Sequence, residues 1–312
     1  MQGHSRPEQP PAVQVDHGRQ IQLSGVGGNL RHVTDPCAVR RIGGEVPFDQ
    51  VNETTTVARL ANWAYYRQVA DHVELGCSTS SQVGDPLSAL IAPLGATEQH
   101  GPHLPLDTDT RIASAVARAT ADAIGAGYSC ADQPWNWLVA PALAYGASGE
   151  HQSFAGTVSV GTEALTLMLV EYGRSASCWA TRVVFVNGHG GNVAALKLAT
   201  KTLRSEGRDV GWCSCSAAGS DAHAGHTETS VLLHLSPEDV LTECWHPGNC
   251  APLADLLLSI RCGGVAAVSP IGVLGNPTTA TAADGERIFA EMVHECVRRI
   301  IRWAPRHDGM LA

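Results

Sequence analysis

The sequence predicts an α/β fold, a three-layer α/β/α sandwich built around a mainly parallel central sheet. Two observations support this prediction. From about residue 88 onwards, short apolar runs alternate with amphipathic segments of helical period, as in parallel sheets that helices cover on both faces. The runs are also continuously apolar, which is typical of strands buried on both sides. The chain has 312 residues, of which 44% are hydrophobic, enough for one large core.

Four apolar runs have the length of strands and end near glycine, proline or polar residues. The strands are expected over residues 88–95, 137–143, 182–188 and 209–215. A further short strand is expected at the end of the glycine-rich loop 145–160, and residues 76–86 are expected to form a loop.

Helical patterns separate these runs. After the first strand, Ile112, Val116, Ala119 and Ala123 recur at helical spacing, and the segment ends in glycines, which commonly terminate helices. Pro237 ends a later pattern in the same sense. The helices are expected over residues 109–127, 162–180, 192–207, 225–237 and about 283–303, with a short amphipathic helix over 57–75.

The ends of the chain differ from its centre. Residues 1–60 are rich in Gly, Pro and Gln and show no sustained periodicity, so we expect a disordered extension. The folded domain is expected over 61–304, followed by a tail over 305–312. No apolar stretch reaches the roughly 18 residues that span a bilayer, and the first residues lack the apolar core of a signal peptide. We therefore expect a cytoplasmic protein without a membrane partner.

The net charge is −9, from 30 acidic and 21 basic residues, and no basic cluster is present. A nucleic-acid partner is therefore not expected.

Potential metal ligands gather in three loops, each of which follows a predicted strand. Because the carboxyl ends of parallel strands meet at one edge of a sheet, these loops are expected to converge. Histidine with carboxylate suits Zn²⁺, Fe²⁺ or Mn²⁺ in a catalytic site, and a bridging carboxylate permits two metals that activate water for hydrolysis. The candidates are Glu98, His100, His103, Asp107, Asp109, His189, Asp221, His223, His226 and Glu228.

Structural roles compete with this hypothesis. A single buried glutamate is more often hydrogen-bonded structure than a ligand, and a single loop histidine is more often solvated. We interpret His103, Asp107, Asp221 and His226 as capping, supporting or surface residues. Glu228 differs, because Val231, Leu232 and Leu235 place it on the apolar face of its helix. A carboxylate there needs a cation or hydrogen bonds.

The same segments resemble the creatininase family. The segment PLGATEQHGPHLPLDTDT resembles the metal loop of the family, and FAGT resembles its F-P-G-T turn, with Ala155 in place of proline. The segments VNGHGGN and HAGHTETS resemble the second and third parts of its site, and the likeness covers about residues 62–302. The resemblance implies two divalent metal ions per chain and a homo-oligomer.

The resemblance also implies roles for individual residues. Glu98, His100, Asp109 and His189 match the metal ligands, with Asp109 as the bridging carboxylate, and His223 matches the catalytic histidine. Gly191 departs from creatininase, which has a glutamate ligand at the matching position. We expect Glu228 to supply the missing ligand and so to be required for catalysis. No tryptophan lies near His223, unlike in creatininase, which argues against creatinine as the substrate.

Within the family, the segments STSSQ, PALAYGASGEHQSFAGT and VEYGRSA are most like a branch that acts on a biosynthetic precursor peptide. That likeness implies a metal-dependent peptidase that cuts a modified, Val-Tyr-derived C-terminal dipeptide from the peptide, with His223 giving a proton to the leaving amine. Two alternatives stay open at this point: hydrolysis of a cyclic amide or a formamide, and a non-catalytic, metal-bound scaffold.

Overall fold

A computed structural model describes residues 74–83, 88–125 and 136–312. The fold described below lies within Glu53–Ala312, one of the two units into which the chain divides. The extension expected over residues 1–60 and residues 57–73 of the expected amphipathic helix lie outside the described residues. The described end of that segment is not α-helical, because Leu75–Cys77 forms a 3₁₀ turn.

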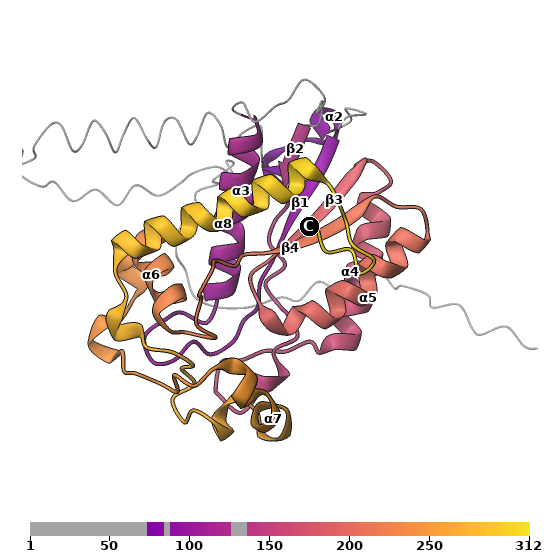
Figure 1. The fold of residues 1–312 in the computed structure, drawn as a ribbon. Helices are drawn as coiled ribbons and strands as arrows, with labels where there is room; N and C mark the ends of the chain where they lie inside the picture. The colour runs from indigo at the N-terminus through magenta and orange to yellow at the C-terminus, as the bar shows by residue number, and fades with distance from the viewer. Residues whose placement is uncertain (1–73, 84–87, 126–135) are drawn as a thin grey trace, which may run out of the picture. The chain divides into compact units, whose positions relative to one another are not determined.

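Four parallel strands form the central sheet in the order β2-β1-β3-β4 (Figure 1). They are β1 (Ser88–Leu94), β2 (Asn136–Val139), β3 (Arg182–Asn187) and β4 (Val210–Ser214). The register pairs Ile91 of β1 with Val139 of β2 and with Val184 of β3. Strand β2 is shorter than expected, because Pro141 has no N–H to donate to the ladder.

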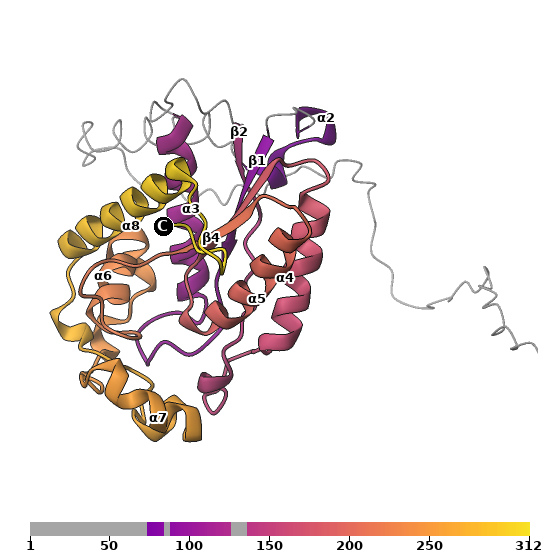
Figure 2. The ribbon, with the colours of Figure 1, turned by 45° about the vertical axis from the view of Figure 1, so that its right-hand side comes forward.

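Helices cover both faces of the sheet (Figures 1 and 2). One layer holds α3 (Thr108–Gly125), α6 (His226–Leu235) and α8 (Ala282–Arg302), and the other holds α4 (Thr162–Ala176) and α5 (Val193–Ser205). Successive strand residues point to opposite layers: Ile91 packs in the core with α3, α6 and α8, while Leu90 packs in the core with α4 and α5. The predicted three-layer α/β/α sandwich with a parallel sheet is confirmed.

Three local expectations were wrong. The segment expected to be a loop at 76–86 contains one helical turn, α2 (Ser80–Val83). The short strand expected near residue 160 does not form; Val158 makes one isolated bridge to Thr97, because left-handed backbone at Gly156 and Gly161 interrupts the extended chain on either side. Helix α7 (Leu253–Gly263) was not expected, because it buries Leu256 but leaves most of its other side chains exposed, so no one-sided pattern marks it.

Short 3₁₀ segments complete the connections. Besides Leu75–Cys77 they are Gly149–His151, Gly190–Asn192, Pro237–Asp239, Thr242–Cys244, Val265–Ala267 and Pro277–Thr279. Among the described residues, no helix is both long and apolar enough to cross a membrane.

The C-terminal residues, expected as a tail, pack against the outer strand of the sheet. The Leu311 N–H donates to the Trp212 carbonyl at 2.9 Å, and the Trp212 N–H donates to the Gly309 carbonyl at 3.0 Å. The Leu311 side chain is fully buried in the core with α8. These residues therefore cover an edge of β4 that would otherwise expose unpaired backbone groups.

We predict that Leu311→Ala lowers the free energy of unfolding by about 2–5 kcal/mol, since it removes a buried side chain and leaves a cavity. Urea or thermal denaturation measures the change. Leu258→Ala is the matched control, because Leu258 is 75% exposed on α7, and it should change the free energy of unfolding by less than about 0.5 kcal/mol. Equal stability of Leu311→Ala and the parent chain would show that the C-terminal segment is not part of the core.

Candidate metal centre

Five loop and helix segments meet where the strands of the sheet end. Glu98 and His100 follow β1, Asp109 lies in the first turn of α3, and His189 follows β3. His223 precedes α6, and Glu228 lies in the first turn of that helix. The three loops that the sequence predicted to converge therefore do meet at one edge of the sheet.

Two glycines let the first turn of α3 approach the strand ends. A side chain at Gly95 would overlap the backbone and side chain of Thr110, and one at Gly188 would overlap the carbonyl oxygen of Asp109. Without these side chains, the turn packs directly against the segments that follow β1 and β3. Asp109 is thereby held between the histidines of those two segments.

The Asp109 carboxylate faces one histidine with each oxygen. Its Oδ1 atom lies 3.2 Å from His100 Nε2, and its Oδ2 atom lies 3.2 Å from His189 Nδ1. On the side of His189, Glu98 Oε2 is 3.2 Å from Nε2. On the side of His100, Glu228 Oε2 is 3.8 Å from Nε2. The site thus has two halves that share Asp109.

Several of these polar atoms are buried without a hydrogen bond. Both carboxylate oxygens of Glu98 and the Oδ2 atom of Asp109 have no hydrogen-bond partner among the described residues, although the Glu98 side chain is fully buried. A buried carboxylate in this state needs a cation. The residues fit divalent metals, because Glu98, Asp109 and His189 form one group of converging ligand atoms, and His100, His223 and Glu228 form another.

The buried charges perturb one another strongly. Burial opposes protonation of His100, but Asp109 and then Glu228 and Glu98 outweigh it and raise the pKa of His100 to about 10. Burial also opposes protonation of His189, yet the adjacent carboxylates of Glu98 and Asp109 raise its pKa well above the usual value. The two histidines in turn overcome burial and hold the pKa of Asp109 below its usual range. Burial raises the pKa of Glu228 to about 7.

His223 is electrostatically different from these two histidines. Burial, together with the proximity of His100 and His151, holds the pKa of His223 well below its usual value. Its ring lies against both of these histidine rings, at 4.4 and 4.3 Å between centroids. His223 is therefore a neutral imidazole near neutral pH.

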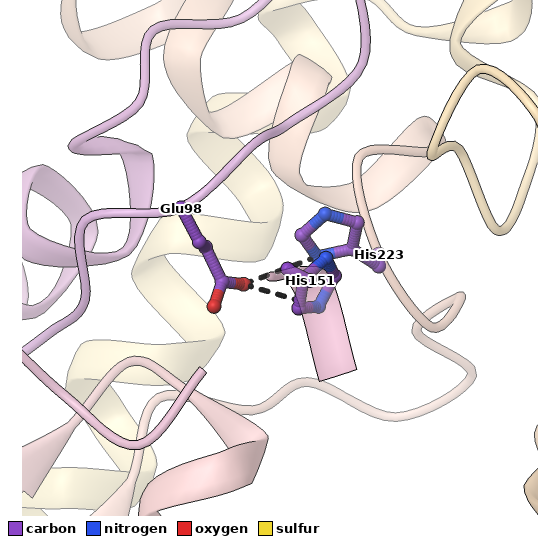
Figure 3. Close-up of side chains that lie close together, drawn as sticks. All are labelled: Glu98, His151 and His223. Carbon is purple, nitrogen blue, oxygen red and sulfur yellow. Dashed lines mark ion pairs between the residues drawn. The ribbon is translucent and has the colours of Figure 1, made fainter. Parts of the chain in front are cut away.

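The sequence analysis missed two residues of the centre, His151 and Gln99. His151 and His223 both point toward Glu98 (Figure 3), with His151 Nε2 at 3.5 Å and His223 Nδ1 at 3.6 Å from Glu98 Oε1. Gln99 is buried between them and contacts both rings. The polar segment GEHQ, which begins at the second glycine of the loop 145–160, was the available signal for His151, whereas no local pattern marks Gln99.

The four residues interpreted as structural lie outside these two ligand groups. His103 Nε2 is 2.9 Å from the Thr229 hydroxyl, and Asp107 pairs with Arg111. Asp221 accepts hydrogen bonds from the first backbone N–H groups of α6, those of His226 and Thr227. The side chain of His226 contacts the Thr279 hydroxyl at 2.9 Å.

There is no space at Gly191 for the glutamate that creatininase has at the matching position. A Cβ atom there would overlap the Ala147 carbonyl and His189 Nε2, and would lie 2.7 Å from Glu150 Oε1. Glu150 Oε1 is also 3.7 Å from His189 Nε2. The carboxylate of Glu150 thus lies next to the place that a side chain at position 191 would occupy.

A cleft of about 700 Å³ opens onto the centre. Asp109, His189 and Glu228 lie along its floor, while Leu253 and Leu257 of α7 form part of its wall. The cleft therefore combines charged ligand atoms with an apolar surface that can hold a bulky organic group.

Known proteins are similar to this chain in sequence and in fold. The family model for creatininase, described as creatinine amidohydrolase, matches residues 79–300. A mycofactocin precursor peptide peptidase of Mycobacterium ulcerans (strain Agy99) is 66% identical over 251 residues, which is 80% of this chain and 99% of that protein. One of Mycolicibacterium smegmatis is 62% identical over 250 residues, again 80% of this chain and 99% of that protein.

A solved structure titled "Creatininase Mn" superposes with a TM-score of 0.61 at 27% identity, covering 75% of this chain and 99% of that chain. The sequence and structural matches extend over the sheet, its helices and the converging loops. The chain belongs to the creatininase family of amidohydrolases.

Proposed function

We propose that this protein is a metal-dependent peptidase that hydrolyses an amide bond of the mycofactocin precursor peptide and releases its modified, Val-Tyr-derived C-terminal dipeptide. The observation that carries the proposal is the pair of histidines, His100 and His189, that face the two oxygens of Asp109 where the cleft meets the centre. Identity of 62–66% over nearly the full length of the mycobacterial peptidases supports the same substrate.

Two divalent metal ions fit the two halves of the centre. Glu98 and His189 would hold one ion, His100 and Glu228 the other, and Asp109 would bridge them. His and carboxylate ligands suit Zn²⁺, Fe²⁺ or Mn²⁺. The creatininase structure compared above carries manganese in its name. When bound, such ions polarise the scissile carbonyl group and lower the pKa of the attacking water.

His223 supplies the proton transfer in this proposal. Its Nε2 atom is 2.8 Å from the backbone carbonyl of Gln99, which leaves Nδ1 to face Glu98. Because the ring is neutral, Nδ1 can accept the proton of the attacking water and then donate it to the leaving amine. His223 thus acts first as a base and then as the general acid inferred from the family resemblance.

The walls of the cleft support a peptide rather than a small polar substrate. Leu253, Leu257 and Ile260 of α7 give one wall an apolar character, suited to the side chains of a Val-Tyr-derived group. Arg261 lies on the same wall. The centre is at the base of the cleft, so an amide bond near the end of a peptide can reach it.

We propose in addition that the chain forms a homo-oligomer.

Metal-loaded protein incubated with the modified precursor peptide tests the proposal. Mass spectrometry should show loss of the modified C-terminal dipeptide and no cut elsewhere. Turnover of creatinine or a formamide without cleavage of the peptide would favour the hydrolysis of a small amide instead. Full metal content without turnover of any amide would favour a scaffold.

We predict that Asp109→Asn loses affinity for both metal ions, because each carboxylate oxygen faces a different histidine. Metal content after dialysis, measured by mass spectrometry, should fall below one ion per chain, and the peptidase rate should fall at least about 100-fold. Asp107→Asn is the matched control, since Asp107 is half exposed and pairs with Arg111. It should keep the metal content of the parent. Two ions in Asp109→Asn would contradict the bridging role.

We predict that Glu228→Gln lowers the affinity for the metal ion on the His100 side more than the affinity for the ion on the His189 side. The variant keeps the size of the side chain but removes the charge that lies 3.8 Å from His100 Nε2. Metal titration should show one site of near-normal affinity and one that is at least about tenfold weaker. Glu238→Gln, at an exposed position, is the control. Two unchanged sites would show that Glu228 only accepts the hydrogen bond of the Ala224 N–H.

We predict that metal uptake by the metal-free protein releases protons. Carboxylates raise the pKa of His100 to about 10 and raise that of His189, so both rings are protonated at neutral pH and must lose a proton to become ligands. Apparent affinity should therefore increase with pH between 6 and 8, by up to about tenfold per pH unit for each proton released. Calorimetry in buffers of different ionisation enthalpy counts the protons, and an affinity that is constant over this range would refute the prediction.

A further inference from the structure

Gln99 connects the two histidines that face Glu98. It is buried, lies in sequence between Glu98 and His100, and contacts residues from three other segments. Its amide Nε2 is 2.8 Å from His151 Nδ1, 3.1 Å from the Gly272 carbonyl and 3.1 Å from His223 Nε2.

Two backbone partners determine which way the Gln99 amide points. The Gly101 N–H can only donate, and it lies 2.9 Å from Oε1. The Gly272 carbonyl can only accept, and it lies 3.1 Å from Nε2. Exchanging the oxygen and nitrogen of the amide would break both hydrogen bonds, so the orientation is unambiguous.

The backbone carbonyl of Gln99 assigns the proton of His223. This carbonyl is 2.8 Å from His223 Nε2 and can only accept, so Nε2 carries the hydrogen. A neutral imidazole has one N–H, and the Nδ1 atom is therefore left with its lone pair. That lone pair lies on the side of Glu98.

The side chain of Gln99 assigns the proton of His151. One amide hydrogen goes to the Gly272 carbonyl, and His223 Nε2 already carries a hydrogen of its own. The second amide hydrogen therefore goes to His151 Nδ1, the nearest partner, and Nδ1 acts as the acceptor. A ring whose Nδ1 accepts a hydrogen bond carries its hydrogen on the other nitrogen, so the His151 hydrogen is on Nε2, which faces Glu98 Oε1.

We propose that Gln99 is a positioning residue that sets the ring tautomers of His151 and His223, so that His223 Nδ1 presents a lone pair and His151 Nε2 presents an N–H to the centre. The proposal rests on the proposed function only for its effect on turnover. Gly272 provides the space for this arrangement, because a side chain there would overlap the Gln99 amide. Gly272 also has a φ of 80°, which favours glycine.

The proton positions on His151 and His223 decide whether a third metal ion can bind. Glu98, His151 and His223 form a third group whose atoms converge closely enough for a metal ion. Histidine binds metals through a deprotonated nitrogen, and the Nε2 atom of His151 is protonated. This third group is therefore a donor and acceptor pair for water or substrate, and the chain binds two metal ions rather than three.

Histidine-selective ¹⁵N NMR of the zinc-loaded protein tests the assignment directly. Both rings should be protonated on Nε2, and metal analysis should give two zinc ions per chain. In Gln99→Glu the carboxylate cannot donate, so the His151 proton should move to Nδ1. The rate constant kcat should then fall roughly 10- to 100-fold with little change in KM, as for other partners that orient functional histidines.

Gln152→Glu is the matched control, because Gln152 is exposed and lies next to His151 in the chain. It makes the same change of charge and should leave both tautomers and kcat unaltered. Gln99→Met, which removes the hydrogen bonds without adding charge, should also lower kcat, and it replaces Gln99→Glu if that variant does not fold.

The proposal is overturned if the parent protein has His151 protonated on Nδ1, if it binds three zinc ions, or if Gln99→Glu keeps both the tautomer and the kcat of the parent. The NMR and zinc measurements need no turnover. Assigned tautomers without peptidase activity would therefore refute the proposed function alone.

Discussion

Two buried carboxylates with oxygens that lack a hydrogen-bond partner among the described residues determine the rest of this structure. Glu98 has two oxygens and Asp109 one without a hydrogen-bond partner among the described residues, and both residues are buried. A fold can keep such groups only where cations or protonated histidines surround them. His100 and His189 do this in the protein alone, and their raised pKa values measure how strongly the carboxylates demand positive charge. Divalent metal ions would satisfy the same demand.

The parallel sheet explains where these groups can be assembled. All four strands end at the same edge, so loops that are distant in sequence meet there. The absence of side chains at Gly95 and Gly188 lets the first turn of α3 approach this edge. Asp109 consequently comes from a helix, while the two histidines that it contacts come from the segments after β1 and β3.

Much of this arrangement could be predicted from the sequence. The strands and helices have strong periodic patterns, and the positions of Glu98, His189 and Glu228 follow from the ends of those elements. Gln99 and His151 could not be recognised in this way. Their partners lie far away in the chain, since Gln99 bonds with Gly272 over 173 positions and with His151 over 52. Only the folded chain brings these partners together: the segment GEHQ is the one local signal for His151, and no local pattern marks Gln99.

Helix α7, which forms part of the cleft wall, has few buried contacts with the rest of the fold. Its buried residue Leu256 packs in a small cluster with Val265 and Leu274, separate from the two cores of the sandwich. Segments with few buried contacts open locally at a lower free energy than the core does. The candidate ligands, by contrast, are anchored at the ends of β1 and β3 and in α3 and α6. We therefore expect the α7 wall of the cleft to open at a lower free energy than the floor, which would let a bulky substrate enter and its product leave while the floor keeps its geometry.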